Sequence, residues 1–311
     1  MKGRLALIFA LATLAAIASE HTALAAPNCS VTFSSVAFGP NIDVLSGASV
    51  DSAGVATVSC SNFGGANVEV CIGMNNGANA VGAPRQMASG ANKLSYDLYT
   101  DSARSARWEN VKALLPSFIL TVATPSVDVP VYGRLAPAQT TAPVGAYFDT
   151  ITPSVYWDSY SGATPPCSAL PNTINAGAFQ VTGTVTANCS VSATNLIFPS
   201  QGVIRTAVDA QSDIFVTCTT SAPYWIGLDG GSTAASDPTQ RKMSLGGQTI
   251  TYGLYSDAGR TSPWGAAKDV NTVSGTGSAA STTFPVYGRI PVQSTPAPGT
   301  YQDIVVVTVN F

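Results

Sequence analysis

Short runs in which hydrophobic and polar residues alternate recur along this chain, and such runs are typical of half-buried β-strands. The clearest run covers residues 178–187, where apolar residues alternate with glutamine and threonines. Clusters of Gly, Pro, Asn and Ser separate the runs, and no segment combines a helical periodicity with capping residues. The pattern therefore predicts an all-β protein.

Five short motifs of the first half recur in the second half at an offset of about 155–160 residues. They are Asn-Cys-Ser-Val at 28 and 188, Arg-x-Met at 85 and 241, Tyr-x-Leu-Tyr-x-Asp at 96 and 252, Val-Tyr-Gly-Arg at 131 and 286, and Gly-x-Tyr-x-Asp at 145 and 299. Matches in one order over such a length indicate a duplicated domain. Together with the strand pattern, they predict two immunoglobulin-like β-sandwich domains in tandem.

The first 25 residues have the form of a secretory signal peptide. Lys2 and Arg4 precede an apolar run over residues 5–17, and Ala23 and Ala25 provide the small residues of a cleavage site. A buried first helix is the less favoured alternative. No later stretch approaches the ~18 uninterrupted apolar residues of a membrane helix. We therefore expect residues 1–25 to be removed and the rest of the chain to be exported.

All six cysteines follow the expected cleavage site, and an even count in an exported chain favours disulfides. Their spacing contains no CxxC pair and is too wide for zinc knuckles. The first two cysteines of the chain and the last two occupy equivalent positions in the two copies, so each copy is expected to form one disulfide between its own two cysteines. Elimination then pairs the remaining two. The expected disulfides are Cys29–Cys60, Cys71–Cys167 and Cys189–Cys218.

The first copy continues beyond its last matching strand into the alternating run at 178–187. Because no comparable run precedes Cys29, we expect this strand to complete the first domain from within the same chain. The expected divisions are a first domain at 26–176, a linker strand at 177–187 and a second domain at 188–311. The residues of the linker strand that would face the core are Phe179, Val181, Gly183 and Val185.

The second copy ends at Phe311, where its last strand ends, so its sandwich is short of one strand. Exposed apolar core and unpaired backbone favour pairing with a strand from another chain. Three apolar anchors would contribute roughly 5–9 kcal/mol to that pairing. The alternative is a second domain that closes on itself with an earlier segment of its own. The last strand would border the open groove with Val305, Val307, Val309 and Phe311.

Charge and histidine content exclude several classes of function. Charged residues make up 10% of the chain, and 14 Lys and Arg against 17 Asp and Glu leave no basic surface for nucleic acid. His21 is the only histidine and lies in the leader, so the exported part lacks the base of a Ser-His-Asp triad and any histidine metal ligand. The acidic residues of the motifs occur in both copies, which favours structural roles over a glycosidase pair. We expect no catalytic residue, metal or cofactor.

The ordered set of motifs, with a tryptophan between Tyr-x-Leu-Tyr-x-Asp and Val-Tyr-Gly-Arg, resembles the spore coat protein U domain in both copies. This resemblance implies a subunit of an archaic (Csu-type) chaperone–usher pilus, and a two-domain member resembles the tip adhesin. It also implies three partners: a periplasmic chaperone, an outer-membrane usher and a next subunit that donates its N-terminal strand. Such a protein would pass through the periplasm to the cell surface and support attachment and biofilm formation.

Three loops of the first copy are expected at the end far from the second domain, at 61–67, 102–126 and 158–177, and the first two carry apolar residues where the second copy is mostly polar. By resemblance, such loops of a tip adhesin grip hydrophobic abiotic surfaces, and exposed apolar patches commonly mark contacts. The candidate contact residues are Phe63, Leu114, Leu115, Phe118, Ile119, Tyr160 and Leu170.

There are three alternatives to this assignment, of which the second is disfavoured. Residues 118–122 also fit a core strand, which would leave only Leu114 and Leu115 exposed. A structural coat or shaft subunit is disfavoured by the missing N-terminal donor strand. A lectin-like adhesin that binds a host glycan would use polar groups of the third loop, namely Asp158, Tyr160, Asn172 and Asn175.

Overall fold

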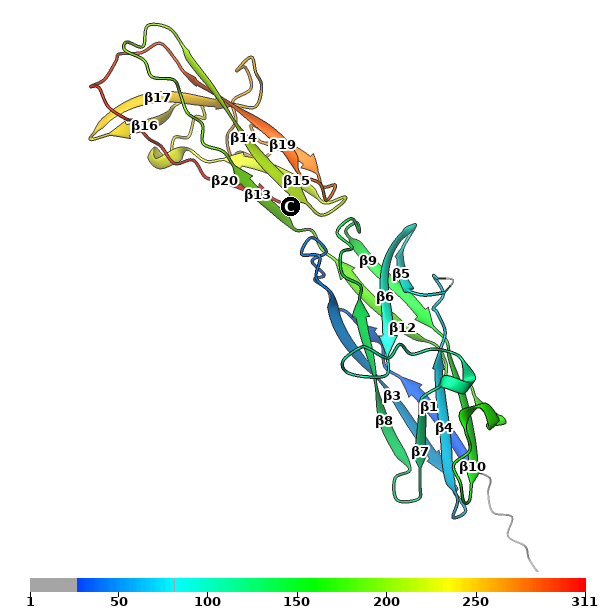
Figure 1. Cartoon of the computed structure of the whole chain (residues 1–311). Coiled ribbons are helices and arrows are strands. Elements are labelled where there is room, and N and C mark those ends of the chain that lie inside the picture. Colours follow the sequence, from blue (N-terminus) through cyan, green and yellow to red (C-terminus); the bar gives the residue numbers. More distant parts are fainter. Residues whose placement is uncertain (1–26, 81) are drawn as a thin grey trace, which may run out of the picture.

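Two β-sandwich domains lie end to end in the computed structural model of the chain, which describes residues 27–80 and 82–311 (Figure 1). The leader expected at 1–25 lies outside these residues. The prediction of an all-β protein with two tandem immunoglobulin-like domains is confirmed. Among the residues described, the helical segments are short 3-10 turns, and none is long and apolar enough to cross a membrane.

The first domain packs an eight-stranded sheet against a four-stranded sheet. The larger sheet has the order β1-β3-β8-β6-β5-β9-β12-β2, and the smaller has the order β11-β10-β4-β7. The turns η1 (Lys112–Leu114) and η2 (Cys167–Ala169) lie in its long loops. The strands are β1 (Asn28–Phe33), β2 (Val36–Ala37), β3 (Val50–Ser61), β4 (Asn67–Met74), β5 (Arg85–Ser89), β6 (Asn92–Tyr99), β7 (Ser117–Leu120), β8 (Ser126–Leu135), β9 (Gly145–Ile151), β10 (Pro153–Tyr160), β11 (Asn172–Ile174) and β12 (Phe179–Val185).

The second domain repeats this plan with fewer strands. Its sheets have the orders β13-β14-β19-β17-β16 and β18-β15-β20, and η3 (Gly231–Thr233) follows β15. The strands are β13 (Cys189–Ala193), β14 (Val208–Cys218), β15 (Pro223–Leu228), β16 (Arg241–Leu245), β17 (Gln248–Tyr255), β18 (Val273–Thr276), β19 (Thr282–Ile290) and β20 (Val307–Asn310).

Each domain encloses one tryptophan and one arginine of the repeated motifs at equivalent places. The indole N–H groups of Trp108 and Trp264 each donate to a backbone carbonyl, at 2.8 and 3.0 Å. Arg85 and Arg241 are fully buried and donate mainly to backbone carbonyls. Because buried polar groups need hydrogen-bond partners, these residues hold the shared fold together.

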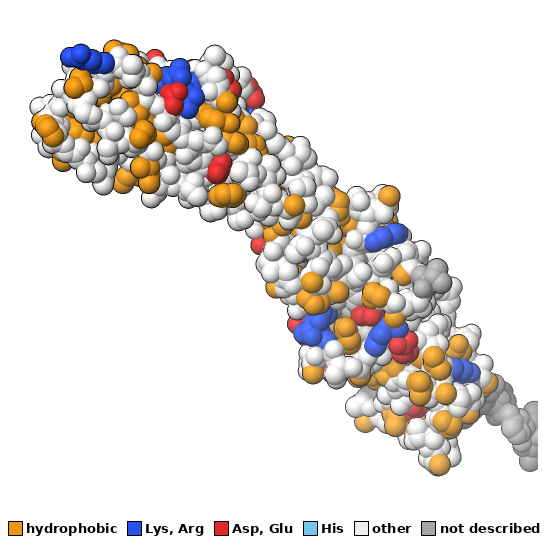
Figure 2. Space-filling model, turned by 45° about the horizontal axis from the view of Figure 1, so that its top comes forward, with side chains coloured by type: hydrophobic (Ala, Val, Ile, Leu, Met, Phe, Trp, Pro, Cys, Tyr) orange, Lys and Arg blue, Asp and Glu red, His pale blue; other side chains and the backbone are white. Residues whose placement is uncertain are grey.

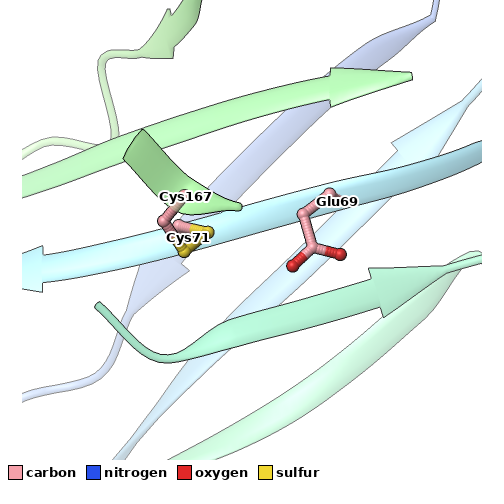
Figure 3. Close-up of side chains that lie close together, drawn as sticks. All are labelled: Glu69, Cys71 and Cys167. Atoms are coloured by element: carbon pink, nitrogen blue, oxygen red, sulfur yellow. A yellow bond between two sulfur atoms is a disulfide. The ribbon is translucent and has the colours of Figure 1, made fainter. Parts of the chain in front are cut away.

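Three disulfides are present, and they join the pairs expected from the sequence. Cys29–Cys60 ties β1 to β3, and Cys189–Cys218 ties β13 to β14 in the same way. Cys71–Cys167 ties β4 to η2, so it holds the long loop after β10 against the smaller sheet (Figure 3).

A connection of three residues leads from β12 into β13. At this junction, Asn188 Nδ2 donates to Asp43 Oδ2 at 2.8 Å, and Val144 N donates to Thr220 O at 3.0 Å. The end of the first domain that is farthest from this junction, formed by the turns at 61–66 and 121–125, is called the distal end below (Figure 1).

Candidate functional site

β12 lies inside the first domain as a strand inserted between β9 and β2. It pairs antiparallel with β9 along its whole length, from Phe179 opposite Ile151 to Val185 opposite Gly145, and parallel with β2. Its residues alternate strictly: Phe179, Val181, Gly183 and Val185 are buried in the core, whereas Gln180, Thr182 and Thr184 are not. The core of this domain is therefore covered by a strand that follows it in the chain.

The second domain has counterparts of the strands around β12 but no counterpart of β12 itself among residues 188–311, all of which the structure describes. Residues 299–306, the counterpart of β9, lie outside the named strands and touch β16 through one isolated bridge, Ser244 with Gln302. Five core residues are only half-buried here, and they are called the acceptor face below: Leu196, Phe198, Met243, Ile250 and Val305.

The acceptor face matches residues that β12 helps to cover in the first domain. Phe198 meets Tyr252 edge-on at 6.1 Å between ring centroids, as Phe38 meets Tyr96 at 6.1 Å. The first-domain counterparts are at most 7% exposed. These counterparts are Val36, Phe38, Met87, Leu94 and Ile151. The same packing is thus complete in one domain and open in the other.

Four large apolar side chains in the segments around Leu196, Phe198 and Val305 are exposed, and they were missed by the sequence reasoning. Their exposed fractions are 53–77%, and residues equivalent to them in the first domain are alanine, aspartate and two threonines. A position-by-position comparison of the two copies would have revealed them. They are Ile197, Val203, Ile304 and Val306.

A carboxylate lies next to the position of β12 in each domain. In the first, Asp149 is fully buried opposite Val181 and accepts a hydrogen bond from the hydroxyl of Tyr96 at 2.8 Å. In the second, Asp303 accepts the equivalent bond from Tyr252 at 2.7 Å but is half-buried. Burial, together with the neighbouring carboxylate, raises the pKa of both tyrosines, so each hydroxyl stays a donor.

The last strand of the chain lies beside the acceptor face. Val305, Val307 and Val309 are half-buried against the core, as expected for one face of a strand, and β20 pairs with β15. Phe311 follows the end of β20 and is 58% exposed, so it packs less closely than the valines of that face.

Three of the seven candidate contact residues are buried, so the expectation that they face solvent is wrong. Phe63 turns back from the β3–β4 loop into the main core. Leu115 and Leu170 form a small cluster with the Cys71–Cys167 disulfide on the outer face of β4. The loop after β10 folds over this face of β4 and buries both leucines. The described part of the second copy has no such loop, so the repeat did not reveal this packing.

The other candidates differ in exposure, and for Phe118 and Ile119 the reason is that β7 alternates between two faces. Leu114 is 72% and Ile119 is 50% exposed, whereas Phe118 is half-buried against the core. Tyr160 is half-buried and shares a hydrogen bond with Thr164 Oγ1 at 3.1 Å. Two exposed valines in the same segment of the chain were missed by the sequence reasoning, Val111 and Val122. We call the four exposed residues Val111, Leu114, Ile119 and Val122 the distal patch, and Figure 2 shows exposed hydrophobic side chains scattered over the surface of the first domain.

The polar groups proposed for a glycan site bond to one another or to their own loop. Asn172 Nδ2 donates to Asp158 Oδ1 at 3.3 Å, and Asn175 Oδ1 accepts from the backbone of Gly177 at 3.3 Å. Tyr160 bonds to its own loop as described above. The expected lectin residues therefore have structural partners in the protein.

Glu69 is a buried carboxyl on the outer face of β4, close to the Cys71–Cys167 disulfide (Figure 3). Because both sulfurs are oxidised, they offer no thiolate for a metal. Glu69 is 1% exposed, its Oε2 has no hydrogen-bond partner among the described residues, and it lies opposite Asp158 on β10. Burial raises the pKa of Glu69, although a hydrogen bond with Ser117 opposes the shift.

Glu69→Gln is expected to stabilise the first domain at pH 7. A raised folded-state pKa means that the folded protein binds the proton more tightly, so stability falls as the pH rises above the unfolded value. The gain should therefore shrink toward pH 4 and vanish below it. The melting temperature of the first domain as a function of pH measures this effect. Glu109→Gln, which removes an ion pair with Arg107, is the control and should give no gain; a pH-independent gain in Glu69→Gln would contradict the assignment.

Comparison with known proteins gives one family and several similar structures. A family described as the Spore Coat Protein U domain matches residues 13–153 and 175–308. Among curated proteins, no sequence matches this chain.

The solved structures that resemble the chain share little sequence with it. The complex of the chaperone CsuC with the tip adhesion subunit CsuE, from archaic chaperone–usher Csu pili of Acinetobacter baumannii, matches with a TM-score of 0.52 and 16% identity over 91% of this chain and 100% of that one. The CupB6 tip adhesin of Pseudomonas aeruginosa matches with a TM-score of 0.41 and 13% identity over 91% and 94% of the two chains. CfaE, the adhesive subunit of CFA/I fimbria of enterotoxigenic Escherichia coli, gives 0.34 and 9% over 89% and 92%.

Proposed function

We propose, from the premise that this chain belongs to the Spore Coat Protein U domain family, that it is the adhesive subunit at the tip of a chaperone–usher pilus. Residues 1–25 direct export, residues 26–176 with the strand at 177–187 form the adhesive domain, and residues 188–311 form an incomplete pilin domain. One observation carries this proposal: β12 covers the core of the first domain, while the acceptor face of the second is half-exposed.

The occupant that fits the acceptor face is an extended strand with apolar residues at alternate positions, because β12 has that pattern in the equivalent place. A neighbouring subunit would supply this strand in the fibre, a periplasmic chaperone would cover the face beforehand, and an outer-membrane usher would direct the exchange. Each buried apolar anchor contributes about 1.5–3 kcal/mol. Because β12 is held inside its own domain, it is not free to enter another subunit, which favours a terminal position.

Supplying the missing strand in the same chain tests this proposal. A copy of residues 158–187 carrying Cys167→Ser, attached after Phe311, would follow β20 as the original follows β10. We expect it to raise the melting temperature of the second domain by roughly 10 °C or more, since several kcal/mol are gained. The control is the same extension with Val181→Asp and Val185→Asp in the copy. Equal melting temperatures with the two extensions would contradict an open acceptor face.

The adhesive contact is proposed for the distal patch, whose large apolar side chains are exposed on the first domain, whereas the acceptor face belongs to the second. A hydrophobic abiotic surface fits this patch, because contact removes the apolar side chains from water without requiring specific hydrogen bonds. Attachment of this kind would support biofilm formation. A host glycan fits less well, since the polar groups of the third loop are already partnered.

Replacing Leu114, Ile119 and Val122 together with serine is expected to reduce attachment to polystyrene at least tenfold, because the variant loses most of the apolar area of the patch. Thermal stability should change little, as all three side chains are exposed. Phe148→Ser removes an exposed aromatic ring elsewhere in the same domain and is the matched control. Unchanged attachment of the triple variant would contradict this surface, and dose-dependent binding on a glycan array would favour the lectin.

A further inference from the structure

Gly183 is the one inward-facing residue of β12 that has no side chain. A Cβ at this position would lie 2.6 Å from Cδ1 of Ile42 and 3.4 Å from Cβ of Phe38, so no larger residue fits without a shift. Ile42 is buried and belongs to the receiving part of the domain. Ile42 therefore fills the space next to Gly183 in the core, and β12 must carry glycine at this position.

The receiving segment of the second domain can be aligned with that of the first by contact as well as by sequence. Gly133 is covered by Val36 and Phe38, whose nearest atoms lie 2.8 and 3.1 Å from a Cβ placed on it. Gly288 is covered in the same way by the aligned residues Leu196 and Phe198, at 2.9 and 2.8 Å. The offset between the two segments is therefore 160 residues, since 198 − 38 = 160 and 196 − 36 = 160.

The same offset places Gly202 where the first domain has Ile42. Two residues further on, Val44 and Ile204 are both buried to the same extent, so the offset holds on either side of this position. No heavy atom lies within 4 Å of a Cβ placed on Gly202, and its backbone is not in the left-handed region. In the second domain, the position equivalent to Ile42 thus contributes no side chain to the core.

We propose that the strand received by the second domain carries a large apolar residue at the position equivalent to Gly183, and that Gly202 provides the room for it. This inference rests on the proposed function and specifies the partner. Gly183 lies opposite Tyr147 on β9, so the incoming residue lies opposite Tyr301. It packs against Phe198 and Met243 of the acceptor face, as counterparts of the residues around Gly183.

Exchanging the large and small residues between strand and receiver makes the two sites selective. A strand with the sequence of β12 leaves a void in the second domain, because neither Gly183 nor Gly202 fills the space. A strand with a large residue at this position meets Ile42 in the first domain. The second domain therefore favours a strand from a different subunit over β12 of another copy, because only the former fills the space at Gly202. The first domain excludes that strand, because its large residue would clash with Ile42.

Four proteins test the exchange. Two carry the extension of residues 158–187 described above, one unaltered and one with Gly183→Val in the copy, and two carry the same extensions together with Gly202→Ile in the second domain. With Gly202 present, the valine extension should raise the melting temperature of the second domain by about 5 °C more than the glycine extension, equivalent to roughly a tenfold preference. With Gly202→Ile, the order should reverse.

Valine has a higher intrinsic strand propensity than glycine, and this effect favours the valine extension in both backgrounds. Only steric fit between the extension and residue 202 predicts that the order reverses. If valine is better by the same amount in both, or if the two extensions are equal in both, the inference is wrong while the open acceptor face stands. If no extension raises the melting temperature above that of the unextended chain, the proposed function itself fails.

Discussion

Val181→Asp is expected to unfold the first domain near physiological temperature and to leave the second domain intact. Val181 is fully buried at the centre of β12, directly opposite Asp149, whose carboxylate is also buried. The new carboxylate would lose its water and lie beside a like charge, which costs about 4 kcal/mol or more. Since a domain has only about 5–15 kcal/mol of stability, little of it remains.

Calorimetry of the full chain measures this effect, because the two domains should give separate transitions. The transition of the first domain should fall by at least roughly 10 °C, and the other should not move. Gln180→Asp introduces the same residue at the adjacent, exposed position of β12 and is the control. If the second domain melts earlier while the first is unchanged, the result would contradict the placement of β12 in the first domain.

Arg85→Ala is expected to cost the first domain about 3–5 kcal/mol. The guanidinium is fully buried and donates to the carbonyls of Asn75, Met74 and Trp108 at 2.7, 2.9 and 2.6 Å, and to Asp97 Oδ1 at 2.6 Å. Alanine would leave a cavity and remove the donor from these acceptors. The variant should therefore show an early first transition in the same calorimetric scan.

Arg134→Ala is the matched control for that prediction. Arg134 pairs with Asp51 through two hydrogen bonds of 2.6 and 2.9 Å, but both side chains are partly exposed on the outer face of the sheet. Exposed ion pairs contribute at most about 1 kcal/mol. Similar losses in the two variants would show that the buried network around Arg85 is not what holds the strands together.

Local pattern determined much of this protein from the sequence alone. The alternation of side chains at 178–187 depends only on the two-residue period of a strand, so it identified which residues of β12 face inward. The repeated motifs include Arg85, Arg241 and the paired cysteines, because these residues occupy equivalent places in the packing of both domains. The two-domain β-sandwich fold and the disulfide pairs followed from these features.

Burial of the loops was decided only by the tertiary structure. Leu114 and Leu115 are adjacent in sequence, yet one is exposed and the other packs on the disulfide at Cys71, because a distant loop folds over one side of β4. The half-burial of the acceptor face and the free space around Gly202 likewise depend on what lies across the core, not on neighbours in the chain. A two-residue period says which way a side chain points, and only the packed fold determines what it meets there.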